Sequence, residues 1–163
     1  MPSETFSVLV ENRFGVLARI AGLFCGRGYN IDSLTVSSTQ NTEYSRMTIV
    51  THGDAVILEQ IEKQLNKKLD VIKIKSFENW QSVTRELILI KLRYNKSNRE
   101  EILTICTLAG AKVVDAGKRQ MMIEMCDTPE KVQMLLDLLS GISIAEVART
   151  GTLALQRCVD TER

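Results

Sequence analysis

The sequence has one histidine, two prolines and only 5% aromatic residues among its 163 positions. Because His52 is the only histidine, one chain cannot assemble a histidine-based metal cluster. A Ser-His-Asp or Cys-His arrangement would have to use His52, and nothing around it is typical of a nucleophile elbow. His52 stands at the end of a predicted strand, so we interpret it as a solvated residue. The sequence therefore predicts no catalytic residue and no metal site.

Paired cysteines, excess charge and long apolar runs are also missing. The four cysteines are widely spaced without a C-x-x-C, and no export or transit signal is visible, so we expect reduced thiols in the cytoplasm. A net charge of +1 argues against nucleic acid, because non-specific affinity needs clustered Lys and Arg. No run approaches the roughly 18 apolar residues of a membrane span, so no membrane partner is expected.

One series of predicted strands and helices occurs twice in the chain, and its first copy lies in residues 6–75. It comprises a strand at 6–11, a helix from Val16 closed by Gly26 and Gly28, strands at 30–38 and 44–52, a helix capped by Asp54, and a strand at 71–75. The helical residues expected in the core are Val16, Leu17, Ile20, Leu23, Phe24, Ile57, Ile61 and Leu65. In the last strand, Ile72 and Ile74 should point inward, with Lys73 and Lys75 in water.

The same series of strands and helices is predicted again in residues 86–149. It comprises a strand at 86–94, a helix with Ser97 and Glu100 as a capping box, a hairpin of 111–117 and 119–126, a helix from Thr128-Pro129, a strand at 142–149 and a short tail. The expected core positions of these helices are Ile102, Leu103, Ile105, Leu108, Val132, Leu135, Leu136 and Leu139. The fold class is therefore α+β, with two ferredoxin-like βαββαβ domains at residues 1–79 and 80–163. Domains of about 80 residues bury only roughly 60% of their unfolded surface, so we expect pairing.

The first loop, ENRFG at residues 11–15, contains more polar groups than a turn needs. Gly15 allows close backbone approach, and the N–H groups of Gly15, Val16 and Leu17 would form an anion site at the helix N-terminus. The amides of Asn12 and Asn30 can donate and accept hydrogen bonds. The alternative is that Asn12 and Gly15 only form a turn. The matching loop at 94–101 has no glycine, so we expect no second ligand site.

Other proteins of this fold class fit poorly. Metal chaperones carry C-x-x-C in the first loop, and RNA-recognition domains carry stacking aromatics on central strands, where this chain has aliphatic residues and Met47. Arg13 in the first loop is a feature that small phosphatases of this fold, the acylphosphatases, also have, but a single arginine is weak evidence for that activity. From the residues alone, a free-standing amino-acid-sensing module that regulates another enzyme or a transcription factor stays open.

The run SVLVENRFGVLARIAGLFCGRGYNIDSLTV, followed by SRMTIVTHGD and LEQIEKQLNKKLDVIKI, resembles the small regulatory subunits of acetohydroxyacid synthase, also called acetolactate synthase. The resemblance is dense over residues 6–76 and continues to EVARTGTLAL near the end. It implies that the N-terminal domain is an ACT domain and that two copies pair as a homodimer. Valine, or leucine or isoleucine, would bind where the first loop of one copy meets the other copy.

The resemblance also implies the site residues and the partner. The matching effector-site positions are Asn12, Gly15, Val16, Leu17, Asn30, Ile31 and Leu34. The family has no chemistry of its own. It activates a large catalytic subunit, which uses thiamine diphosphate, magnesium and FAD to join pyruvate to a second 2-keto acid in valine, leucine and isoleucine biosynthesis. No cofactor is expected in this chain.

Overall fold

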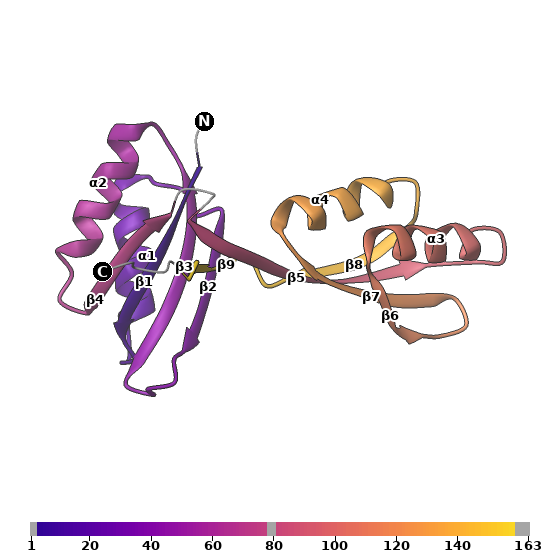
Figure 1. The fold of residues 1–163 in the computed structure, drawn as a ribbon, viewed down its shortest axis with the longest axis horizontal. Coiled ribbons are helices and arrows are strands. Elements are labelled where there is room, and N and C mark those ends of the chain that lie inside the picture. Colours follow the sequence, from indigo (N-terminus) through magenta and orange to yellow (C-terminus); the bar gives the residue numbers. More distant parts are fainter. Residues whose placement is uncertain (1–2, 78–80, 159–163) are drawn as a thin grey trace. The chain divides into compact units, whose positions relative to one another are not determined.

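The computed structural model describes residues 3–77 and 81–158, which divide into two compact units (Figure 1). Unit 1 contains the described residues up to Val83 together with those from Thr152 onward, and unit 2 contains residues 84–151. The predicted boundary between residues 79 and 80 lies outside the described residues. The segment from Thr152, which we placed in the second domain, lies with unit 1.

Unit 1 has the predicted βαββαβ order. Its elements are β1 (Ser3–Glu11), α1 (Val16–Arg27), β2 (Ser33–Ser38), β3 (Tyr44–His52), α2 (Ala55–Asn66) and β4 (Val71–Phe77). The strands form an antiparallel sheet in the order β2-β3-β1-β4. Both helices pack on one face, where alternate residues of β1 and β3, such as Val8 and Ile49, form a core with Ile20 and Ile61.

Four local predictions in unit 1 are wrong. Leu17, expected in the core beside Val16, is 45% exposed, because it lies outside the buried face of α1. Gly26 lies inside α1, and Gly28 alone ends the helix, in a left-handed conformation. The strand expected at 30–38 begins only at Ser33. Ile72 is 50% exposed, because the register between β1 and β4 shifts beside Leu9. A β-bulge there turns Ile72 outward, and Val71 and Ile74 pack against the core instead.

Replacing Asp54 by alanine should destabilise unit 1 by about 1 kcal/mol, because this residue caps α2. Its side chain accepts a hydrogen bond from the Ile57 N–H at 2.8 Å, as predicted. Thermal unfolding followed by circular dichroism measures the change. Thr128→Ala is the matched control, since Thr128 precedes α4 (Pro129–Leu138) without a side-chain cap bond. An equal fall in Tm for the two variants would contradict the capping role.

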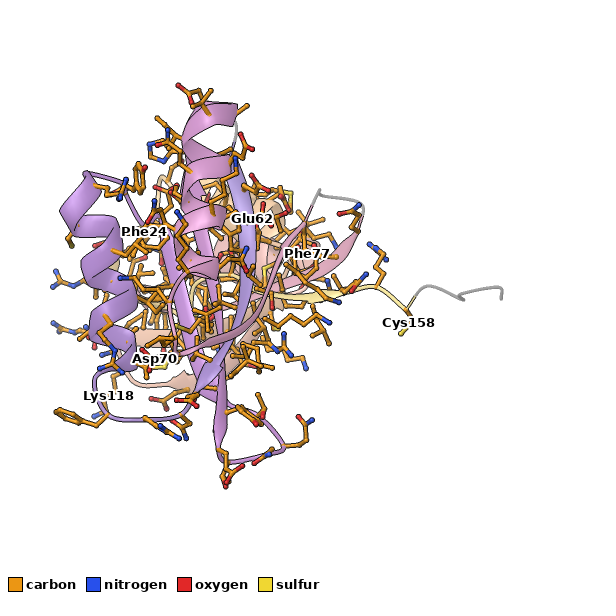
Figure 2. The ribbon with its side chains drawn as sticks, turned by 90° about the vertical axis from the view of Figure 1, so that its left-hand side faces the viewer. Phe24, Glu62, Asp70, Phe77, Lys118 and Cys158 are labelled. Carbon is orange, nitrogen blue, oxygen red and sulfur yellow. The ribbon has the colours of Figure 1, made fainter. Side chains whose placement is uncertain are left out.

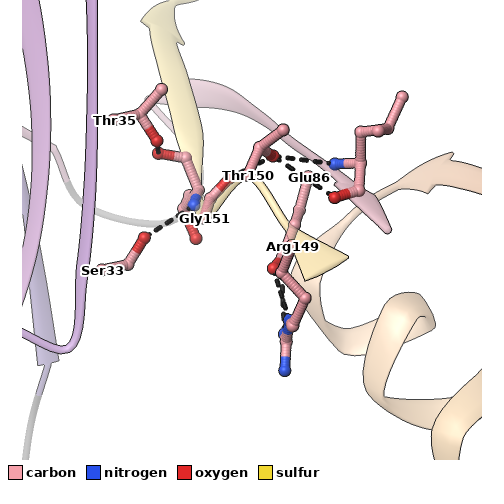
Figure 3. A network of polar contacts seen from close by, with 8 residues as sticks. Ser33, Thr35, Glu86, Arg149, Thr150 and Gly151 are labelled. Atoms are coloured by element: carbon pink, nitrogen blue, oxygen red, sulfur yellow. Dashed lines mark hydrogen bonds and ion pairs between the residues drawn. The ribbon is translucent and has the colours of Figure 1, made fainter. Parts of the chain in front are cut away.

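A further strand, β9 (Leu153–Gln156), occupies the short tail, where we predicted no strand after residue 149. Just before it, the Thr152 N–H donates to Ser33 Oγ at 2.7 Å, and Thr35 Oγ1 donates to the Thr152 carbonyl at 3.1 Å (Figure 3). Ala154 is fully buried, and its N–H reaches Thr48 Oγ1 at 3.4 Å. Because Thr35 and Thr48 alternate with the core residues of β2 and β3, β9 lies on the helix-free face of the sheet.

Unit 2 repeats the order. Its elements are β5 (Ser82–Arg93, beginning in unit 1), α3 (Arg99–Ala109), β6 (Lys112–Ala116), β7 (Gln120–Asp127), α4 and β8 (Ile144–Arg149). The sheet order is β6-β7-β5-β8, and β9 also pairs with β5. Val132, Leu135 and Leu139 are buried as predicted, and Leu136 packs beside them. The two sheets with their helices confirm the α+β class.

Two predictions for α3 are wrong. Ser97 and Glu100 form no capping box, because the helix begins after Asn98, and Asn95 Oδ1 accepts the N–H groups of Ser97 and Asn98. The buried face also differs. It contains Ile102, Ile105, Cys106 and Ala109, whereas Leu103 and Leu108 are exposed. The predicted stripe was rotated toward the larger side chains, and the helix buries Cys106 and Ala109 instead.

Candidate functional site

The first loop, between β1 and α1, requires a glycine at its last position. Gly15 has φ of 80° and ψ of −4°, a left-handed conformation that few other residues adopt without strain. Gly15 is the N-cap of α1 and has no side chain to satisfy the first-turn N–H groups. The Val16 N–H, which we expected to be free, donates to the Arg13 carbonyl at 3.3 Å. The turn role and an uncapped helix N-terminus therefore coexist.

Asn12 fixes this loop to the turn between β2 and β3. Its backbone N–H donates to the Glu43 carbonyl at 2.7 Å, and its side-chain Nδ2 donates to the Thr42 carbonyl at 2.9 Å. Part of the Asn12 amide is thus used within the chain. Its side chain is exposed, so the amide also faces solvent beside Gly15.

An ion pair stands beside the loop, and sequence reasoning missed it. Arg19 donates to both carboxylate oxygens of Asp70 at 2.7 and 3.0 Å. This hydrogen bonding lowers the pKa of Asp70 and raises that of Arg19. A Cβ atom on Gly15 would lie 3.0 Å from Arg19 Nη1, so the guanidinium lies close to the start of α1. In Figure 2, Asp70 is labelled near one end of α1 and Phe24, a residue of α1, is labelled closer to the other end. A signal was available, since Arg19 follows Gly15 by four residues, one helical turn.

Asn30 belongs to a second polar cluster. Its Nδ2 donates to Asp32 Oδ1 at 2.6 Å, and Asp32 also contacts His52 Nδ1 at 2.7 Å. The Asn30 carbonyl accepts the Thr51 hydroxyl at 2.6 Å. His52 is an exposed strand-end residue, as predicted, but its partner Asp32 was not foreseen. Asn30 and Ile31 precede β2 instead of starting it.

The structure divides the predicted effector residues into two groups that lie apart. Asn12, Gly15, Val16 and Leu17 lie at the N-terminal end of α1, whereas Asn30 lies beyond its C-terminal end. With 12 residues and 1.5 Å per residue, α1 separates them by about 18 Å. The sheet register agrees, because Glu11 pairs with Tyr44 at one end of β1 and Ser3 with His52 at the other.

The side chains of the predicted site differ in availability. Val16 is 2% exposed and packs in the core, so only its backbone can face a ligand. Leu17 is 45% exposed beside the loop. Ile31 and Leu34 are half-buried against the core near the Asn30 group. Each group thus has polar atoms with an apolar neighbour, but one chain does not join them.

The described residues offer little for other chemistry. In residues 3–77 and 81–158, no group of three or more His, Cys, Asp or Glu side chains is placed to hold a metal ion. Within the same ranges, none of the helices has the length and apolar character needed to cross a membrane. Arg13, the residue that suggested an acylphosphatase, is 3.3 Å from Glu11.

Comparison with known proteins agrees with this architecture. Residues 6–73 match the family model described as the AHAS small subunit-like ACT domain, and residues 85–158 match the model described as the small subunit of acetolactate synthase. The acetolactate synthase small subunit of Mycolicibacterium smegmatis is 47% identical over 96% of this chain and 92% of that protein. The probable acetolactate synthase small subunit of Archaeoglobus fulgidus is 44% identical over 94% and 96%.

A solved structure covers both units. The crystal structure of the acetolactate synthase small subunit from Thermotoga maritima matches with a TM-score of 0.90 at 34% identity, over 98% of this chain and 99% of that one. The resemblance in the sequence is thereby confirmed, and unit 1 contains an ACT domain. The chain belongs to the acetolactate synthase small-subunit family.

Proposed function

We propose that this chain activates a separate catalytic subunit of acetolactate synthase and makes it sensitive to feedback inhibition by valine or another branched-chain amino acid. The observation that supports this proposal is the division of the predicted effector residues into two groups at opposite ends of α1. A site built from both groups is incomplete in one chain, so it needs a second copy.

Edge-to-edge pairing of two copies would complete this site. The strand β2 is at the end of the strand order in unit 1, and an edge strand offers unpaired backbone groups to another chain. Antiparallel pairing of β2 with β2 of a second copy is isologous. It places the Asn30 end of one copy beside the first loop of the other. A homodimer formed in this way has two equivalent effector sites.

The chemistry of the two groups suits an amino acid. The carboxylate would lie at the start of α1, where a helix N-terminus contributes about 0.3–1 kcal/mol and up to about 2 when partly buried. Arg19 donates to Asp70 through Nε and Nη2, and its Nη1, the atom nearest Gly15, would donate to the ligand carboxylate. The ammonium would meet the oxygens of Asn30 and Asp32 from the other copy. Burying an aliphatic side chain beside Leu17, Ile31 and Leu34 contributes about 1.5–3 kcal/mol.

Inhibition follows from linkage. Valine shifts activity only if it binds one arrangement of the paired units better and the catalytic subunit prefers another. A site shared by two copies has this property, because filling it changes how they pack. In this proposal the thiamine diphosphate, magnesium and FAD belong to the cytoplasmic catalytic partner, and this chain performs no chemical step.

Replacing Asn30 by alanine tests the shared site. We expect the valine concentration for half-inhibition of the reconstituted enzyme to rise about tenfold or more, because one charge-assisted hydrogen bond is lost. Activation of the catalytic subunit should persist. Asn66→Ala, at the exposed end of α2, is the control and should leave both properties unchanged.

Two outcomes would contradict the proposal. If Asn30→Ala abolished activation as well, Asn30 would belong to the contact with the catalytic subunit. If the unmodified chain neither co-purified with a catalytic subunit nor activated it, the free-standing sensing module would be favoured instead.

A further inference from the structure

Unit 2 contains a cavity of about 510 Å³ at the end of β5. This volume is within the range of roughly 300–1,000 Å³ that is typical of small-molecule sites. The end of β5 and the turn between β6 and β7 meet there, since Arg93 pairs with Gln120 (Figure 1). The lining residues are Arg93, Tyr94, Gly117, Lys118, Arg119 and Gln120.

Three of these side chains are cations, and the lining contains no acidic residue. Arg93, Lys118 and Arg119 are exposed, and in the described part of the chain none of them forms an ion pair or donates a side-chain hydrogen bond. The whole chain has a net charge of only +1, so this cluster is a local excess. Cations that surround one cavity without internal partners favour an anionic ligand.

The cavity occupies the same corner of the repeated fold as the first loop in unit 1. There, the Asn12 N–H donates to the Glu43 carbonyl at 2.7 Å, and here the Tyr94 N–H donates to the Arg119 carbonyl at 3.0 Å. Glu11, which ends β1, corresponds to Arg93, which ends β5. Both units therefore join the same strand end to the same turn, but in unit 2 the flanking acidic residues are replaced by arginines.

The corner also has a fixed backbone. The Tyr94 hydroxyl donates to the Gly117 carbonyl at 2.5 Å, and the Gly117 N–H donates to the Gln120 carbonyl at 2.8 Å. These bonds hold the turn that carries Lys118 and Arg119. Glu100 and Glu101 already occupy the first turn of α3, so the positive charge comes from the side chains and not from that helix.

We propose that this corner of unit 2 is a second ligand site, which binds a small diphosphate, free or as an ester. Arginine presents a planar fork of donors that matches phosphate oxygens, and lysine supplies a point charge. Two arginines and one lysine around one cavity suit a ligand with several negative charges. The sequence had indicated no site in this loop because it lacks a glycine, but the cations come from the strand end and from the turn.

Calorimetric titration of the whole chain tests this site, with inorganic pyrophosphate and uridine diphosphate as probes. We expect saturable binding of at least one probe. Lys118→Ala with Arg119→Ala should weaken it about tenfold or more, because charge-assisted hydrogen bonds are lost while the Arg119 backbone carbonyl stays. Arg93→Ala should act in the same direction. Lys112→Ala, exposed on β6 but outside the lining, is the control and should bind as the unmodified chain does.

The two probes separate the sources of the diphosphate. Equal affinity indicates recognition of the free anion, and tighter binding of uridine diphosphate indicates an ester that fills the rest of the cavity. The proposal is overturned if neither probe binds, if the double variant of the turn binds both unchanged, or if Lys112→Ala weakens binding equally. The titration needs neither valine nor the catalytic subunit, so its result is independent of the proposed regulation.

Discussion

Replacing Gly15 by aspartate should lower valine affinity at least a hundredfold. The new carboxylate would stand at the start of α1, where the ligand carboxylate is proposed to lie, and like charges at one site repel. It would also lie beside Arg19, since a Cβ on Gly15 is 3.0 Å from Nη1 of this residue, and would use the cation that the ligand needs. Calorimetric titration with valine measures the loss.

The same change should have a small effect on folding. A non-glycine residue at φ of 80° costs about 1 kcal/mol, and aspartate tolerates this region better than most residues. A negative charge at a helix N-terminus is stabilising and offsets about 0.3–1 kcal/mol of this cost. Gly15→Asn is the matched control, because it has the same shape and backbone strain without the charge, and it should bind valine more tightly than the aspartate variant. If Gly15→Asp lowered Tm strongly but bound valine normally, Gly15 would serve only the turn.

The sequence predicted the elements where local periodicity determines them. The strand β3 has the predicted bounds, and α1 buries Val16, Ile20, Leu23 and Phe24, which follow helical spacing. The β-bulge at Ile72 could not be predicted, because it depends on the register between β1 and β4, which are distant in sequence. For the same reason β9 was missed, since its contacts are with Ser33, Thr35 and Thr48.

The candidate site divides in the same way. The resemblance and the first loop identified Asn12 and Gly15, and the structure places both at the start of α1. The ion pair of Arg19 with Asp70 became visible only in the fold, because it joins residues 51 positions apart. By contrast, Arg19 follows Gly15 by one helical turn and Asp32 follows Asn30 by two residues, so the sequence alone could have indicated both. One charged residue on a predicted helix is weak evidence for a ligand site, because such residues are usually solvated.

Replacing Arg149 by alanine should destabilise unit 2 by about 2–4 kcal/mol. Arg149 donates to both oxygens of Glu86, at 2.6 and 2.9 Å (Figure 3). Glu86 is only 3% exposed, so without this partner its carboxylate stays buried and uncompensated. Arg149 is 39% exposed, which places the cost below that of a fully buried pair. Chemical denaturation followed by circular dichroism measures the loss.

The same two strands offer a matched control. Lys91 on β5 and Glu146 on β8 form an ion pair at 2.6 Å, but Glu146 is 69% exposed. Lys91→Ala should therefore cost less than about 1 kcal/mol, because solvent screens exposed pairs. Replacing Glu86 and Arg149 together by leucine should recover most of the stability, since no buried charge is left. If Arg149→Ala cost no more than Lys91→Ala, or if the double variant were the least stable, burial of Glu86 would not determine the energy of the pair.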